Sequence, residues 1–193
     1  MSGESLKPWR ILKSDTVYAC PPYLSVESQR VALPDGREIE PYFRINLRSW
    51  VVMIAVTEDR NVVIGRQYRH GYERISLMLP GGLLEPGEDY LVAAKRELLE
   101  ETGYASDEWE DLGRYVPNSS YRCGEAHLFL AKSAKKVAEP ESDDLEETEW
   151  LLLPLDQLVK DLGNGDVISM STVAALCMAA LRLPKWVSSN AKV

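Results

Sequence analysis

The first part of the chain alternates apolar and polar residues in short segments that end at turn-forming residues. Residues 15–32 are predicted to be extended, with apolar or aromatic side chains at Tyr18, Tyr23, Leu24, Val26 and Val31. Leu33-Pro34-Asp35-Gly36-Arg37 predicts a tight turn, because proline presets φ and glycine accepts a left-handed backbone. A second strand is expected to about Leu47, so the pattern predicts an N-terminal β-hairpin.

A continuous apolar segment follows and predicts the central strand of the fold. Trp50 to Val56 is apolar throughout and has the length of a strand that is covered on both faces. Further strands are expected over Val62–Arg69, near Leu112–Pro117, over Ala126–Ala131 and over Trp150–Leu153, and helices over Leu155–Leu162 and Ser171–Leu183. This order predicts an α/β (α+β) fold. We expect an N-terminal strand or hairpin extension at 1–47 and a main domain at 48–193.

Local signals predict a helix over residues 90–102. Asp89 is a suitable N-cap, because its carboxylate can accept hydrogen bonds from the first-turn amides, and Gly103 is suited to end the helix. Leu91, Ala94 and Leu98 recur at the spacing of a single apolar stripe. The helix is therefore expected to pack this stripe against the sheet.

Composition and charge narrow the range of functions. The 193 residues carry a net charge of −8, and the acidity is local. Residues 81–104 hold six acids against two bases, a balance of −4, and residues 139–149 hold seven acids and no base. Nucleic acid is not an expected partner of such a chain. No apolar segment is long enough to cross a membrane, and the three widely spaced cysteines favour reduced thiols in a cytoplasm.

Three acidic residues of the predicted helix share one face. Glu97, Glu100 and Glu101 are three and four positions apart, so their carboxylates are expected to point the same way. Carboxylate oxygens suit Mg²⁺, Mn²⁺ or Ca²⁺ better than Zn²⁺ when no His or Cys accompanies them. Arg96 stands four residues before Glu100 and could hold one of these carboxylates in position.

The spacing around these residues resembles the signature of the Nudix hydrolases. It consists of Gly82, Glu88 and the segment Arg96-Glu97-Leu98-Leu99-Glu100-Glu101-Thr102-Gly103-Tyr104. Tyr104 stands where the family usually has an aliphatic residue. The resemblance implies the Nudix α/β/α sandwich with a mixed sheet. It also implies attack by water on the pyrophosphate of a nucleoside diphosphate that is linked to another group.

The resemblance also implies roles for individual residues. Glu97, Glu100, Glu101 and the carbonyl of Gly81 are expected to bind Mg²⁺ or Mn²⁺, and Glu100 and Glu101 are assigned to the catalytic centre. Four residues of the motif are expected to be structural, namely Gly82, Glu88, Arg96 and Gly103.

Features outside the motif resemble the ADP-ribose and nucleotide-sugar pyrophosphatases. Gln67-Tyr68-Arg69 is similar to an element of that subgroup, and Arg69 is expected to contact a substrate phosphate. The N-terminal hairpin, which often exchanges between subunits in the subgroup, implies a homodimer. Glu141-Ser142-Asp143 lies where these enzymes carry a catalytic base or a further metal ligand, and Glu141 is the favoured candidate.

Three positions depart from the subgroup. Met78 replaces a glutamate, Gly81 stands where alanine is usual, and Ser119 replaces a proline. ADP-ribose or a nucleotide sugar is the expected substrate, with cleavage to a nucleoside monophosphate and a sugar phosphate. Two alternatives stay open: hydrolysis of dinucleoside polyphosphates or nucleoside triphosphates, and a Nudix-fold sensor that binds a nucleotide without catalysis. The sensor is disfavoured because all three glutamates of the motif are retained.

Overall fold

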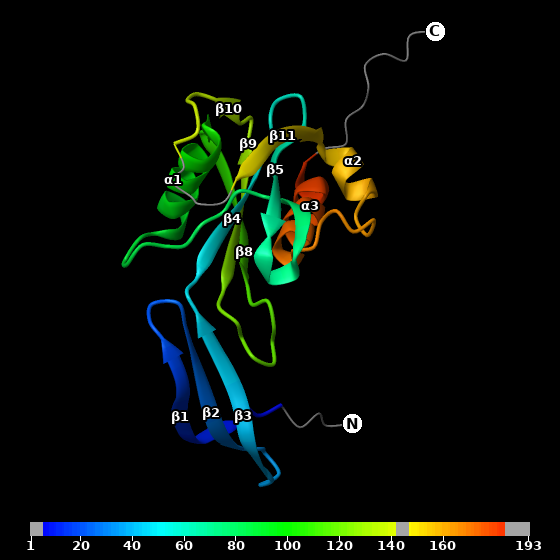
Figure 1. The fold of residues 1–193 in the computed structure, drawn as a ribbon. Coiled ribbons are helices and arrows are strands. Elements are labelled where there is room, and N and C mark those ends of the chain that lie inside the picture. Colours follow the sequence, from blue (N-terminus) through cyan, green and yellow to red (C-terminus); the bar gives the residue numbers. More distant parts are fainter. Residues whose placement is uncertain (1–5, 142–146, 184–193) are drawn as a thin grey trace. The chain divides into compact units, whose positions relative to one another are not determined.

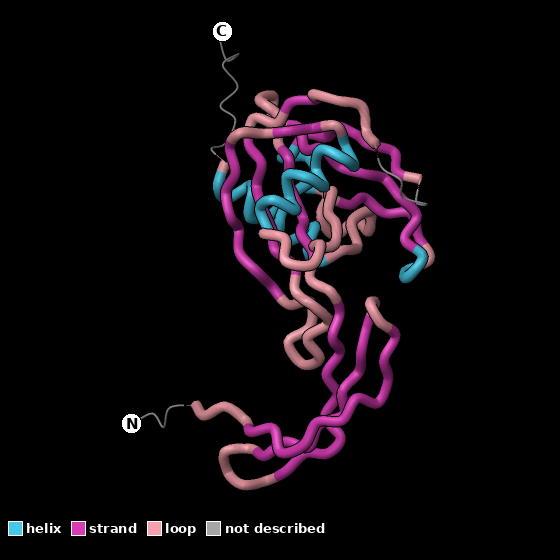
Figure 2. Tube along the Cα trace, turned by 90° about the vertical axis from the view of Figure 1, so that its left-hand side faces the viewer, coloured by secondary structure: helices cyan, strands magenta, loops and turns pink. Residues whose placement is uncertain are grey.

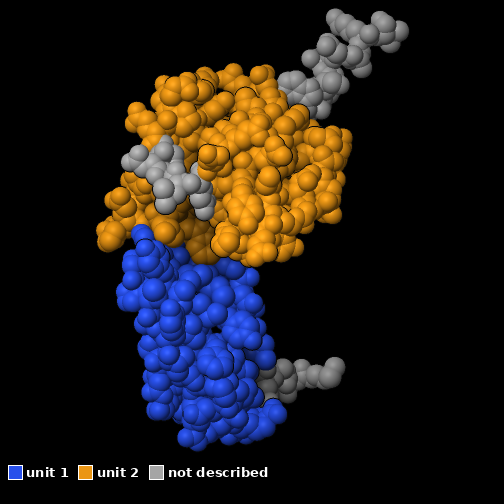
Figure 3. Space-filling view, in the orientation of Figure 1, with its two compact units in different colours: residues 1–49, 116–125 blue, residues 50–115, 126–193 orange. Residues whose placement is uncertain are grey.

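The computed structural model describes residues 6–141 and 147–183. Within them the chain forms two compact units, shown in different colours in Figure 3. Unit 1 comprises Met1–Ser49 and Val116–Glu125, and unit 2 comprises Trp50–Tyr115 and Ala126–Val193. No helix of the described residues is long and apolar enough to span a membrane.

Unit 1 is built around an antiparallel sheet in the order β1-β2-β3. Its strands are β1 (Arg10–Cys20), β2 (Leu24–Ala32) and β3 (Glu38–Leu47). The predicted turn at 33–37 is present, and Gly36 adopts a φ of 87°. The expectation that residues 15–32 form one extended segment is wrong. The segment is broken at Pro21-Pro22-Tyr23, because proline has no N–H for the ladder and the Tyr23 amide turns back to the Cys20 carbonyl at 2.9 Å.

A second segment of unit 1 comes from much later in the chain. Residues 116–125 connect two strands of unit 2, yet they pair with β3. The Ile45 amide donates to the Tyr121 carbonyl at 2.9 Å, and the Cys123 amide donates to the Ile45 carbonyl at 3.2 Å. The Tyr42 hydroxyl also donates to the Ser120 carbonyl. Periodicity gave no sign of this pairing.

Unit 2 contains a layer of strands with helices on both faces (Figures 1 and 2). Its strands are β4 (Trp50–Ala55), β5 (Asn61–Arg69), β6 (Arg74–Met78), β7 (Tyr104–Ala105), β8 (Glu108–Tyr115), β9 (Ala126–Lys132), β10 (Lys135–Lys136) and β11 (Thr148–Pro154). Its helices are α1 (Tyr90–Thr102), α2 (Leu155–Lys160) and α3 (Met170–Arg182), with a 3-10 turn at His70–Tyr72. The strands are ordered β4-β9-β8, β11-β5-β6 and β10-β7, and β4 pairs with β9 in parallel while the other pairs are antiparallel. The predicted mixed sheet is confirmed.

Strand β4 shows why the domain has helices on both faces. Alternate residues of a strand point to opposite faces. Val52 and Ile54 pack in one cluster with Ala175, Leu176 and Ala179 of α3 and Leu155 and Leu158 of α2. Val51 and Met53 pack in the other with Ala93, Ala94 and Leu98 of α1. The buried central strand and the α/β/α sandwich expected from the sequence are both confirmed.

The loop before α1 extends the sheet along β4. The Met53 amide donates to the Pro80 carbonyl at 3.0 Å, and the Val51 amide donates to the Gly82 carbonyl at 2.9 Å. Residues 80–82 therefore run beside β4 in antiparallel pairing, and they place the glycines of the motif next to the end of α1.

Helix α1 begins and ends where the local signals predict. The Asp89 carboxylate accepts hydrogen bonds from the amides of Leu91 and Val92, at 2.9 and 3.3 Å. Gly103 has a φ of 72°, a conformation that favours glycine, and its amide donates to the Leu99 carbonyl. These caps fix the helix register, and with it the direction of the glutamates.

Candidate active site

Two of the predicted glutamates meet the glycine loop that runs beside β4. The Gly81 amide donates to Oε2 of Glu101 at 3.0 Å. A Cβ placed on Gly82 would lie 2.1 to 2.3 Å from the three atoms of the Glu97 carboxylate. Glycine at position 82 therefore leaves room for the Glu97 carboxylate, which a larger residue would displace.

Arg96 ties the carboxylates of α1 together. Its Nε and Nη2 atoms each donate to Glu88 at 2.9 Å, which makes a bidentate pair. Its Nη1 atom donates to Glu97 at 2.9 Å and to Glu100 at 3.1 Å. The Glu88 carboxylate also accepts from the Glu85 amide at 2.9 Å. The hydrogen bonds from Arg96, and then the one from Glu85, hold the pKa of Glu88 below its usual value.

Each of these carboxylates accepts a hydrogen bond from Arg96 or from a backbone amide. Among the described residues, no group of three or more His, Cys, Asp or Glu side chains is arranged to hold a metal ion. The chemistry of the donor set nevertheless fits a hard divalent cation, since the carboxylates of Glu97 and Glu101 both meet the glycine loop and no His or Cys accompanies them. Glu97 and Glu101 thus meet at the glycine loop, and Glu100 is joined to Glu97 through Arg96, which pairs with both.

The segment that contains Glu141 is tied to the end of α1. The Glu141 amide donates to the Glu100 carbonyl at 2.9 Å, and the Val137 amide donates to the Gly103 carbonyl at 2.8 Å. A Cβ on Gly103 would lie 2.0 Å from the Ala138 carbonyl oxygen, so glycine is required for this approach as well as for the helix end. Asp143, the other acid considered for this loop, lies outside the described residues.

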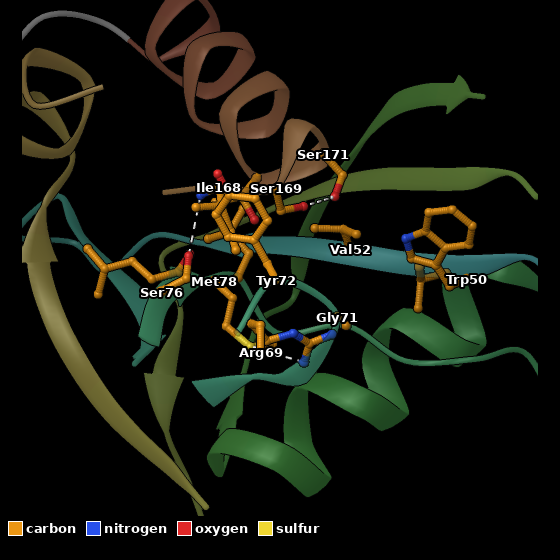
Figure 4. A pocket seen from close by; sticks show the side chains of 15 residues that line it. Trp50, Val52, Arg69, Gly71, Tyr72, Ser76, Met78, Ile168, Ser169 and Ser171 are labelled. Carbon is orange, nitrogen blue, oxygen red and sulfur yellow. Dashed lines mark hydrogen bonds between the residues drawn. The ribbon is translucent and has the colours of Figure 1, made fainter. Parts of the chain in front are cut away.

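Arg69 lies at a pocket that adjoins the acidic site. Its Nη1 atom donates to Oε1 of Gln67 at 2.6 Å and to the sulfur of Met78 at 3.8 Å. Arg69, Met78 and Gly81 all line a pocket of about 400 Å³, shown in Figure 4. Gly81 therefore belongs to both the pocket and the acidic site, since it lines the pocket and its amide donates to Glu101. Met78, which departs from the subgroup pattern, contacts Arg69 here.

Several residues of this pocket were not identified from the sequence. Tyr72 comes from the 3-10 turn, and Ser169, Ser171 and Thr172 come from the start of α3. A serine before an apolar helical pattern is a signal for a helix start but not for a pocket. Only the fold brings the start of α3 to the glycine loop.

Comparison with known proteins places these features in a family. The model of the NUDIX domain matches residues 47–171. A CMP-5'-(N-acetyl-N-hydroxy-3-aminopropyl)phosphonate hydrolase of Streptomyces rubellomurinus is 33% identical over 80% of this chain and 74% of its own. An ADP-ribose pyrophosphatase of Bacillus subtilis is 29% identical over 76% of this chain and 79% of its own. The crystal structure of an ADP compounds hydrolase superposes with a TM-score of 0.80 at 26% identity, over 93% of this chain and 96% of that one.

Proposed function

Because the chain belongs to the Nudix family of hydrolases, we propose that it cleaves ADP-ribose or a nucleotide sugar at the pyrophosphate. The products are a nucleoside monophosphate and a sugar phosphate. The observation that carries the proposal is the meeting of Glu97 and Glu101 with the Gly81-Gly82 loop, beside a pocket that contains Arg69. The names of the ADP-ribose pyrophosphatase and the ADP compounds hydrolase support this substrate class.

Glu97, Glu100, Glu101 and the Gly81 carbonyl would hold Mg²⁺ or Mn²⁺. A bound divalent cation lowers the pKa of water, neutralises phosphate charge and orients the displacement. The position of the Gly81 carbonyl follows from the pairing with β4. In an antiparallel pair the N–H and C=O of one residue point to the same edge. The Gly81 N–H donates to Glu101, and on this pairing we expect its carbonyl to face the same carboxylates.

The remaining residues position the carboxylates, bind the substrate phosphate and accept the proton of the attacking water. Arg96, fixed by its bidentate pair with Glu88, directs the carboxylates of Glu97 and Glu100. Arg69 contacts a substrate phosphate, and its planar guanidinium suits a bidentate contact. Glu141, held beside α1 by its backbone hydrogen bond, takes the proton of the attacking water as general base.

The exposed apolar residues of unit 1 support a homodimer. Strand β1 is exposed along its whole length and carries Ile11, Val17 and Tyr18, each more than half exposed. Apolar surface of this kind is typical of an interface with another protein. Light scattering is expected to give twice the 21.7 kDa of one chain, and a mass of one chain would refute the dimer.

The three free cysteines, Cys20, Cys123 and Cys177, support a reducing cytoplasmic location.

A substrate panel tests the activity. The protein is incubated with Mg²⁺ and ADP-ribose, ADP- and GDP-sugars, diadenosine polyphosphates or nucleoside triphosphates, and the products are separated. Release of AMP and ribose 5-phosphate from ADP-ribose is the expected result. Turnover of triphosphates alone would overturn the substrate class, and tight binding without any product would identify a sensor. Glu139→Gln, in the same segment as Glu141, is expected to leave turnover unchanged, because the Glu139 side chain is 84% exposed and pairs with Lys136.

A further inference from the structure

The pocket beside the glycine loop lies wholly within unit 2 and opens next to the proposed reaction centre. Its walls come from β4, β6, the 3-10 turn and the start of α3, and the close-up in Figure 4 shows these side chains around one hollow. Its volume of about 400 Å³ is at the small end of ligand pockets. It is suited to one half of a substrate whose pyrophosphate lies at Gly81.

The lining is apolar and aromatic over most of its extent. Val52 and Leu79 are 6% and 3% exposed, and Ile168 and Leu77 also contribute. Trp50 and Tyr72 supply aromatic rings, and Tyr72 is 58% exposed. Among the described residues that line the pocket, Arg69 is the one charged side chain, and no carboxylate is present. Walls of this kind favour a flat, uncharged ring.

The start of α3 supplies the polar groups of the pocket. Ser169 occupies the N-cap position, yet its side chain makes no capping hydrogen bond, and its hydroxyl lies 2.8 Å from that of Ser171. Val173 donates the first helical hydrogen bond, to the Ser169 carbonyl, so the three preceding amides have no acceptor within the helix. Thr172, one residue after Ser171 along the helix, also lines the pocket and is 2% exposed.

We propose that this pocket binds the nucleobase of the substrate, with its edge at Ser169, Ser171 and Thr172 and its face against Tyr72. The inference rests on the proposed function, since it assigns the nucleoside half of the same substrate. Arg69, at the pocket and beside Gly81, then meets the phosphate next to the nucleoside. In this assignment the sugar phosphate half lies outside the pocket.

The chemistry of the polar groups also sets the selectivity. A hydroxyl can donate or accept, so it can pair with an amino group or with a carbonyl of a base. A pocket built from hydroxyls therefore discriminates weakly between an amino and an oxo substituent. We expect ADP-ribose and its inosine analogue to differ by less than about tenfold in kcat/KM.

Binding without metal or turnover tests the assignment directly. Calorimetry on the full chain measures AMP and ribose 5-phosphate separately. AMP is expected to bind, and Tyr72→Ala is expected to weaken it about fivefold to 150-fold, the range for loss of a base–aromatic stack. Thr172→Val should weaken it about fivefold, through loss of one hydrogen bond. Tyr68→Ala is the matched control, because Tyr68 is 50% exposed and points to the opposite face of β5 from Arg69.

The outcomes separate this inference from the function on which it rests. If the wild type hydrolyses ADP-ribose while Tyr72→Ala and Thr172→Val leave AMP affinity and KM unchanged, the base lies elsewhere and the inference is overturned. Loss of ribose 5-phosphate affinity in these variants would place the sugar half here, which also overturns it. If AMP affinity depends on Tyr72 but no dinucleotide or nucleotide sugar is hydrolysed, the base pocket stands and the proposed function fails.

Discussion

Gly82→Ala should separate catalysis from stability. A Cβ at this position would lie 2.1 to 2.3 Å from the Glu97 carboxylate, whereas contacts below 3.0 Å are essentially never seen. The carboxylate must therefore move by about 1 Å, and a misplacement of that size typically costs about 100-fold in rate. We expect kcat/KM to fall by roughly this factor at saturating Mg²⁺.

The effect on stability should be small because the clash falls on the end of a flexible side chain. Weakening of the partly exposed Arg96–Glu97 pair costs about 1 kcal/mol at most. Replacing glycine by alanine offsets this by about 0.4–1 kcal/mol through the unfolded state, since Gly82 is not among the positive-φ glycines. Urea denaturation is thus expected to give a free energy of unfolding within about 1 kcal/mol of the wild type.

A double-mutant cycle identifies the cause of the loss. If the alanine acts only by displacing the Glu97 carboxylate, Gly82→Ala should cost no further activity in a Glu97→Ala background. Additive losses would show that Gly82 acts by another route. Wild-type activity in the single variant would refute the placement of Glu97 against the glycine loop.

Three further predictions concern the carboxylates and the positioning of Arg69. Glu101→Gln should abolish most product release at saturating Mg²⁺ while the thermal unfolding midpoint stays close to that of the wild type; substantial turnover would remove Glu101 from the reaction centre. Arg96 holds the pKa of Glu88 below its ordinary value of 4.5, so this carboxylate stabilises the fold above that pH and its contribution disappears as the pH falls through the lower, folded-state pKa. The stability difference between wild type and Glu88→Gln in urea titrations should therefore be constant near neutrality and vanish in strong acid; a difference that grows on acidification would contradict the pairing. Gln67→Leu should release Arg69 from its 2.6 Å hydrogen bond and raise KM for ADP-ribose about tenfold with little change in kcat, and an unchanged KM would show that Gln67 does not position Arg69.

Features that depend on neighbouring residues in the sequence could be predicted from it. Helix α1 is an example, because Asp89 and Gly103 act within a few residues of the helix ends and fix the direction of Glu97 and Glu101. The central strand at Val51–Val56 is another, since both of its faces are buried and every residue is apolar. The glutamate site follows from such local rules.

Features that depend on distant segments could not be predicted. The pairing of residues 116–125 with β3 uses backbone amides and carbonyls, which carry no mark in the side-chain pattern. The pocket combines Tyr72 with Ser169 and Thr172, and these residues are brought together only when α3 packs on β4. The break at Pro21-Pro22-Tyr23 was visible as a proline pair, but the alternation of apolar residues on either side concealed it.

Unit 1 is formed by two separate segments of the chain, and this limits which truncations and gene fusions can preserve it. Because residues 116–125 leave unit 2 after β8 and return at β9, the polypeptide crosses the border between the units at three peptide bonds. Deleting the residues before Trp50 would leave the Tyr121 carbonyl and the Cys123 amide without their hydrogen bonds to Ile45. Gene fusions that graft this N-terminal sheet onto another hydrolase would have to include the β8–β9 connection as well.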